Sequence, residues 1–164
     1  MSIRLLFLIL ITVLAAPAIR AQQPQVEVIQ YPQLESWFNA ENDTLYVINF
    51  WATWCRPCVA EMPYFEQLQA EMVDQKVKVQ FVSLDFVQDL ESRLLPFLER
   101  RPVKSSVYLL DEPKYNTWID QVAKAWSGAI PATVFVQKSR GVREFHEGDY
   151  TFATLKEKVE SLMQ

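Results

Sequence analysis

The sequence predicts a single α/β domain whose mixed β-sheet is flanked by helices on both faces. Half of the 164 residues are apolar and 13% are aromatic, which is enough to fill one core. Apolar, β-rich runs alternate with helical patterns along most of the chain, as parallel crossovers require. The last two strands instead flank a short turn that contains glycine and precede a helix, which indicates an antiparallel hairpin.

The predicted elements follow one another in the order β-α-β-α-β-α-β-α-β-β-α. The clearest strands are residues 45–51 and 78–85, because continuous apolar runs are typical of strands buried on both faces. We expect strands at residues 26–29, 45–51, 78–85, 106–110, 133–137 and 142–146. We expect helices at residues 32–39, 55–74, 90–100, 115–125 and 152–163.

Prolines and caps refine these helices. Pro57 suits the first turn of its helix, where the missing N–H costs nothing. Pro63 lies inside the same helical pattern and Pro96 inside the next one, so each is expected to bend its helix. Thr151 is expected to cap the last helix.

The first 21 residues have the pattern of a secretory signal peptide. Arg4 supplies a positive start, residues 5–16 are apolar except for Thr12, and the small residues up to Ala21 suit cleavage. The apolar run over 5–19 is shorter than the roughly 20 residues that span a bilayer, although an uncleaved anchor is the alternative. We therefore expect residues 1–21 to be a signal peptide, residues 22–164 to form the domain, and the protein to be exported, with a bacterial periplasm as its compartment.

Composition and charge exclude several classes of protein. The net charge of −4 argues against a nucleic-acid binder, which should be basic. The two cysteines lie too close together to be the framework of a disulfide scaffold. The sequence has one histidine in addition to these two cysteines, so they do not supply the four ligands of a structural zinc site. We expect neither a metal nor a cofactor.

Cys55 and Cys58 form a Cys-x-x-Cys pair directly after the predicted strand 45–51, at the start of a helix. This is a redox arrangement, because free N–H groups and partial positive charge at a helix start favour a thiolate. Cys55 is expected to be exposed, and Cys58 to lie one turn further on and to be more buried. Cys55 would attack a substrate disulfide and Cys58 would then resolve the mixed disulfide.

The segment Phe-Trp-Ala-Thr-Trp-Cys-Arg-Pro-Cys at residues 50–58 closely resembles the active-site segment of the thioredoxin fold. Its continuation, Cys-Val-Ala-Glu-Met-Pro at residues 58–63, is similar to the TlpA/ResA-like thiol-disulfide oxidoreductases of bacterial envelopes. Gly-Ala-Ile-Pro-Ala-Thr at residues 128–133 resembles the cis-proline loop of that family. The resemblance covers essentially the whole chain after residue 21 and implies a thioredoxin-like fold with disulfide-exchange activity.

The resemblance also implies roles for residues outside the cysteine pair. On sequence alone Pro131 reads as a trans proline that starts a strand, whereas the resemblance implies a cis proline opposite Cys55. The backbone of Ile130 would then pair with an extended substrate strand. Trp54 is expected to lie over the disulfide and to contact substrate, although a purely structural role is the alternative.

Glu61 lies three residues after Cys58 on the same predicted helix, so its side chain can face the cysteine turn. A partly buried carboxylate there would have a raised pKa and could accept the proton of Cys58. The alternative is an acid that complements the helix N-terminus. The resemblance favours the proton-transfer role, because Asn49 stands where thioredoxins carry a buried aspartate.

The resemblance further implies partners and a direction. Pro57 resembles the reducing members, which implies a reductase of disulfide-containing proteins, apocytochrome c among them. An upstream membrane electron relay would return electrons to Cys55 and Cys58. Two alternatives on the same fold remain open. A copper-binding assembly protein would use both cysteines and His146. A thiol peroxidase would carry, before its reactive cysteine, a threonine two residues earlier than Thr53 lies.

Overall fold

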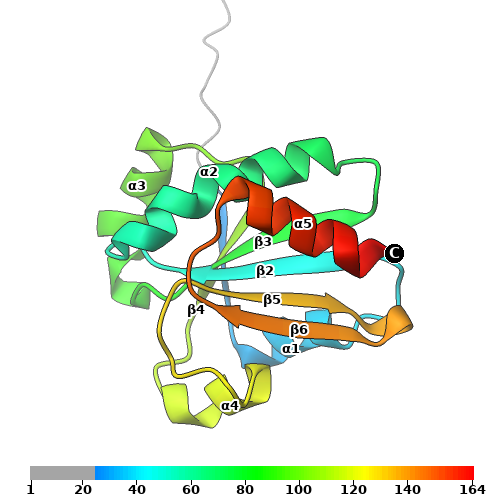
Figure 1. Cartoon of the computed structure of the whole chain (residues 1–164). Coiled ribbons are helices and arrows are strands. Elements are labelled where there is room, and N and C mark those ends of the chain that lie inside the picture. The colour runs from blue at the N-terminus through cyan, green and yellow to red at the C-terminus, as the bar shows by residue number, and fades with distance from the viewer. Residues whose placement is uncertain (1–24) are drawn as a thin grey trace, which may run out of the picture.

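The computed structural model describes residues 25–164 as one six-stranded sheet with helices on both faces (Figure 1). The predicted signal peptide lies outside the described residues. The strands are β1 (Val26–Ile29), β2 (Leu45–Trp51), β3 (Val77–Ser83), β4 (Ser106–Leu110), β5 (Ala132–Gln137) and β6 (Val142–Glu147). The α-helices are α1 (Tyr31–Phe38), α2 (Arg56–Glu71), α3 (Leu95–Arg100), α4 (Ile119–Val122) and α5 (Phe152–Met163). Within residues 25–164, no helix combines the length and apolar character needed to cross a membrane.

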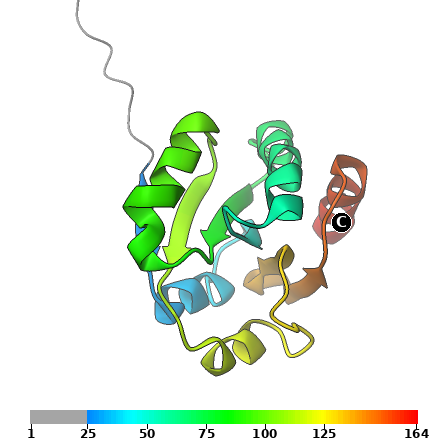
Figure 2. The same ribbon diagram turned by 90° about the vertical axis from the view of Figure 1, so that its left-hand side faces the viewer.

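The strand order across the sheet is β1-β4-β3-β2-β5-β6. The first four strands are parallel to one another, β5 pairs with β2 in the antiparallel sense, and β6 pairs with β5 in the same sense. Helices α2, α3 and α5 cover one face, while α1 and α4 cover the other (Figures 1 and 2). The mixed α/β fold with a final hairpin and helix is therefore confirmed.

Strand β2 lies in the middle of the sheet, and its side chains alternate between two hydrophobic cores. Val47 and Trp51 belong to the core beneath α2, α3 and α5. Ile48 and Phe50 belong to the core on the side of α1 and α4. This explains the unbroken apolar run in the sequence, because a central strand with helices on both faces has no solvent-facing side. The carboxyl end of β2 leads directly into the cysteine turn at the start of α2.

Two predicted helices differ from what the structure shows. Residues 90–100 form a π-helical turn over Leu90–Leu94 followed by α3, with Pro96 in the first turn of α3. Residues 115–125 do not form one helix, because a 3₁₀ turn at Tyr115–Thr117 and the four-residue α4 are separated at Trp118. By contrast, α2 continues through Pro63 for 16 residues.

Candidate active site

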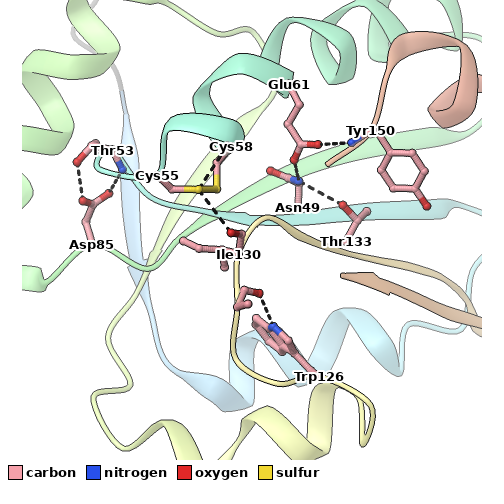
Figure 3. Close-up of a disulfide and its surroundings, with 11 residues drawn as sticks. Asn49, Thr53, Cys55, Cys58, Glu61, Asp85, Trp126, Ile130, Thr133 and Tyr150 are labelled. Carbon is pink, nitrogen blue, oxygen red and sulfur yellow. Dashed lines mark hydrogen bonds between the residues drawn. A yellow bond between two sulfur atoms is a disulfide. The ribbon is translucent and has the colours of Figure 1, made fainter. Parts of the chain in front are cut away.

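The cysteine pair caps helix α2. Cys55 is the N-cap residue and is joined to Cys58 by a disulfide (Figure 3). The backbone N–H of Cys58 donates to Sγ of Cys55 at 3.3 Å, so the helix start already presents a donor to this sulfur. Cys58 is fully buried, as predicted, whereas Cys55 is only 5% exposed and is less open than expected. The reason is that Cys55 packs within the same core as Trp51 and against Ile130.

A proline loop faces the disulfide from the other side. The Ile130–Pro131 peptide bond is cis, as the resemblance implied. Sγ of Cys55 lies 3.7 Å from the carbonyl oxygen of Ile130. The carbonyl of Pro131 accepts a hydrogen bond of 2.9 Å from the N–H of Gly148, which ties the loop to the end of β6. The structure thus brings Cys55, Cys58, Ile130 and Pro131 together.

Trp126 supports this loop from beneath. It is buried, and its Nε1–H donates to the carbonyl oxygen of Ala129 at 2.7 Å (Figure 3). Its ring packs against Phe50 and Trp118, with centroids 4.7 and 5.5 Å away. Trp126 therefore positions the backbone next to Ile130 and does not itself line a substrate surface.

Trp54 lies at the edge of the cysteine turn and is 60% exposed. It forms a wall of an open cavity on the α3 side of this turn. The expectation that it covers the disulfide stays a prediction. Its role in substrate binding stays a prediction, and the exposed indole at the rim of the site is compatible with it.

Asp85 anchors the turn that precedes Cys55, a role that the sequence analysis missed. Its carboxylate accepts hydrogen bonds from the N–H of Thr53 at 2.9 Å, from the Thr53 hydroxyl at 2.6 Å and from the Ser83 hydroxyl at 2.7 Å. Asp85 is buried just beyond β3, the parallel neighbour of β2. An acid at the carboxyl end of a predicted strand was the available signal, since parallel strands end at one edge of the sheet.

Glu61 is almost completely buried, at 1% exposure, beneath the middle of α2. One carboxylate oxygen accepts from Nδ2 of Asn49 at 2.8 Å, and the other accepts from the backbone N–H of Tyr150 at 2.7 Å (Figure 3). Burial raises the pKa of Glu61 to about 7, although these two hydrogen bonds act to lower the pKa. The pKa of this acid therefore lies where protons exchange near neutral pH.

Asn49 belongs to the same buried group. It also donates to the hydroxyl of Thr133 at 3.2 Å, its antiparallel partner on β5, while its own Oδ1 has no hydrogen-bond partner among the described residues. The amide thus joins β2, β5 and α2. Asn49 is therefore a hydrogen-bonded amide within the core.

His146, the only histidine, packs against the ring of Tyr150 with centroids 4.4 Å apart. Among residues 25–164, no three His, Cys, Asp or Glu side chains are grouped so that they could hold a metal ion. The structure therefore adds no support for the copper-binding alternative.

The sequence is similar to a known protein family and to individual relatives. Residues 15–145 match the AhpC/TSA family. The ResA thiol-disulfide oxidoreductase of Oceanobacillus iheyensis is 31% identical over 110 residues, which cover 66% of this chain and 52% of that protein. The chain thus spans about half the length of this curated relative.

Solved structures support the thioredoxin-like fold. MTB DsbF, determined in mixed oxidized and reduced forms, is 26% identical with a TM-score of 0.55, and the match covers 73% of this chain and 81% of that one. The thioredoxin-related protein from Neisseria meningitidis serogroup B has a TM-score of 0.62 at 22% identity, over 75% of this chain and 87% of that one. The second likeness shows the fold alone.

Proposed function

We propose that this chain, which belongs to the AhpC/TSA family, is a thiol-disulfide oxidoreductase that exchanges electrons with protein disulfides through Cys55 and Cys58. The observation that carries the proposal is the cysteine pair at the start of α2, with Sγ of Cys55 held 3.7 Å from the Ile130 carbonyl. This places the reactive sulfur beside the backbone of the proline loop. The 31% identical relative named as a thiol-disulfide oxidoreductase supports the same activity.

The proposed reaction moves two electrons. In the reduced protein the Cys55 thiolate attacks one sulfur of the substrate disulfide, and the other substrate sulfur leaves as a thiolate and takes a proton. The Cys58 thiol loses its proton and attacks Sγ of Cys55. This step forms the Cys55–Cys58 disulfide and releases the second substrate thiolate. The Cys58 N–H and the helix dipole stabilise the Cys55 thiolate at the start.

Substrate would bind along the proline loop. Within residues 25–164, the backbone N–H of Ile130 has no hydrogen-bond partner, and its carbonyl faces Cys55. An extended substrate segment could use both groups, as in short β-strand addition. The loop is held from below by Trp126 and from the side by Gly148, so this backbone is in place before substrate arrives.

We extend the proposal to Glu61 as the group that takes the proton from Cys58. Both residues are buried on α2, three positions apart, and the pKa of Glu61 is raised by burial to about 7. A thiolate on Cys58 and a carboxylate on Glu61 are like charges in one apolar region. Their titrations are therefore coupled, and protonating Glu61 lowers the cost of ionising Cys58.

The direction of electron transfer and the cellular compartment are proposed from the sequence. Pro57 supports a reducing role, and residues 1–21 support export by a signal peptide to a bacterial periplasm. The substrates we propose are oxidised cysteine pairs of envelope proteins, apocytochrome c among them. A membrane electron relay would then return the protein to its dithiol form.

Reduction of insulin by dithiothreitol tests the activity. We expect the protein to accelerate precipitation of the reduced insulin B chain, and Cys55→Ser to abolish the acceleration. Gln67→Ala, an exposed change on the outer side of α2, is the matched control and should retain full activity. Equal rates with and without the protein would contradict the proposal.

The two alternatives make different predictions. Copper titration of the reduced protein tests the assembly-protein alternative, and peroxide consumption tests the thiol-peroxidase alternative. Thr53 gives its hydroxyl hydrogen to Asp85, so it is not free to serve a peroxide at Cys55. We expect neither stoichiometric copper binding nor rapid peroxide turnover.

A further inference from the structure

Three arginines line one cavity next to the cysteine turn. Arg56 lies between the two cysteines at the start of α2, while Arg100 and Arg101 end α3 and follow it. They line an open cavity of about 510 Å³ together with the aromatic side chains of Trp54 and Phe97. The cavity lies between the start of α2 and the end of α3. None of the residues that line it is acidic.

These arginines have no internal partner in the part of the chain that the structure describes. Within residues 25–164, no ion pair or side-chain hydrogen bond involves any of the three, and Arg101 only approaches the ring of Phe97, at 5.7 Å from the centroid. The other three arginines of this region are occupied. Arg93 pairs with Asp89, Arg140 donates to the Leu162 carbonyl, and Arg143 donates to two carbonyls near the end of α4.

The charge of this cavity opposes that of the chain. The whole sequence carries a net charge of −4, yet three cations and no acid line this cavity next to the cysteine turn. Like charges near one another repel, and no acidic side chain lines this cavity to offset the repulsion. A surface of this kind attracts carboxylates, because the guanidinium fork binds them in bidentate fashion.

The shape of the cavity indicates the class of ligand. It opens broadly to solvent instead of enclosing a small molecule, and its rim carries the exposed Trp54. Tryptophan and arginine are the side chains that most often dominate protein–protein interfaces. A protein partner therefore fits better than a small anion.

We propose that this arginine cavity docks an acidic segment of the partner protein, with Asp or Glu side chains that lie close to the partner's disulfide. The proposal rests on the proposed function and adds a rule for choosing substrates. The partner's backbone would lie on Ile130 beside Cys55, and its carboxylates would contact Arg56, Arg100 and Arg101.

The test compares disulfide-bonded peptides that differ only in charge. The fully reduced protein is mixed with peptides closed by one internal disulfide and flanked by three Glu or three Gln residues. The protein is oxidised to its Cys55–Cys58 disulfide and the peptide is reduced to its dithiol, so electrons and protons balance. We expect the acidic peptide to react about tenfold faster at low salt, and the advantage to shrink as ionic strength rises.

Charge reversal locates the effect. Arg100→Glu/Arg101→Glu should abolish the preference for the acidic peptide, and Arg100→Gln/Arg101→Gln should reduce it. The control is Lys114→Glu/Lys124→Glu, which makes the same change in net charge at two exposed positions flanking α4. This control should keep the preference. Equal losses in the arginine and lysine variants would show a general field effect and overturn the proposal.

A neutral probe separates this proposal from the function on which it rests. The parent and the Lys114→Glu/Lys124→Glu control should react with hydroxyethyl disulfide at the same rate, because this probe carries no charge. The rate of each arginine variant with this probe is the reference for its rates with the two peptides. If the parent protein does not react with it, disulfide exchange itself is wrong. If the parent reacts but shows no preference for the acidic peptide, the docking site is wrong. A preference for glutathione disulfide as large as that for the acidic peptide would replace the protein partner with a small anion.

Discussion

Replacing Glu61 by Gln should make the stability of the oxidised protein less dependent on pH. Glu61 is buried at 1% exposure, so its charged form is poorly hydrated in the folded state. In the unfolded chain the carboxyl regains water and its ordinary pKa near 4.5. The folded state therefore binds the proton more tightly than the unfolded state does.

The size of this pH effect on stability follows from the pKa of Glu61, which is about 7 in the folded protein and 4.5 in the unfolded chain. Between them the folded protein holds more protons, so stability falls as pH rises. The stabilisation that Glu61 contributes is fully present below pH 4.5 and is lost as pH rises through about 7. At roughly 1.4 kcal/mol per pH unit, the gap corresponds to a loss of about 3 kcal/mol from this one group.

Urea unfolding of the oxidised protein from about pH 4 to about pH 8 measures this loss. We expect Glu61→Gln to gain about 3 kcal/mol relative to the parent over that range. Glu157→Gln, the same chemical change at an exposed site on α5, is the control and should track the parent. Parallel curves for the parent and Glu61→Gln would refute a raised pKa at Glu61.

The structure also indicates how Glu61→Gln, which puts an amide at a buried site, can be accommodated. The carboxylate of Glu61 accepts from two donors, Asn49 Nδ2 and the Tyr150 N–H, whereas an amide offers one acceptor and one donor group. Within residues 25–164 Asn49 Oδ1 has no hydrogen-bond partner, so rotating the Asn49 amide by half a turn would let it accept from the new NH₂. The variant should therefore fold. In exchange assays it should slow the resolving step and lose the pH dependence near neutrality that we assign to Glu61.

Three further predictions concern the rest of the site. In the reduced protein iodoacetamide should label Cys55 before Cys58, and Cys58→Ala should accumulate mixed disulfides that Cys55→Ala never forms; first labelling of Cys58 would reverse the roles. Asp85→Ala should lower the free energy of unfolding in urea by about 3 kcal/mol, because three hydrogen-bond donors lose their acceptor. Asp85→Asn should lower it by less. An unchanged unfolding midpoint in Asp85→Ala would contradict the anchoring role. Trp126→Phe should lower the free energy of unfolding by about 1 kcal/mol, because the hydrogen bond to the Ala129 carbonyl is lost. It should also slow the reaction with protein disulfides, while the alkylation rate of Cys55 stays that of the parent.

The strands could be predicted from the sequence because their signals are local. Residues 26–29, 45–51 and 106–110 have the same bounds in the structure as in the prediction. The helices near Pro96 and Trp118 were harder to predict. Pro96 lacks an N–H for the preceding turn, and that turn widens into a π-helix. Trp118, Val122 and Trp126 recur at helical spacing, yet Trp118 turns its Nε1–H to the Glu112 carbonyl and the chain becomes extended at Ala123.

The cysteine pair, the cis proline and the burial of Glu61 could be expected from motifs within short segments. The contacts around them could not, because they join distant parts of the chain. Asp85 reaches Thr53 across 32 positions, and Glu61 meets Tyr150 across 89. The arginine cavity likewise needs the end of α3 to lie beside the start of α2. Such contacts depend on strand register and on helix packing, which a single sequence does not specify.

Redox equilibration of the Cys55–Cys58 pair against dithiothreitol, followed by quenched alkylation and mass spectrometry, tests the central claim most directly. We expect one two-electron transition, in which both cysteines are either free or joined, with a reduction potential well below the roughly −120 mV of a strongly oxidising oxidoreductase. A potential near that value would contradict the reducing direction. A disulfide that dithiothreitol does not open without unfolding the protein would contradict the redox role itself.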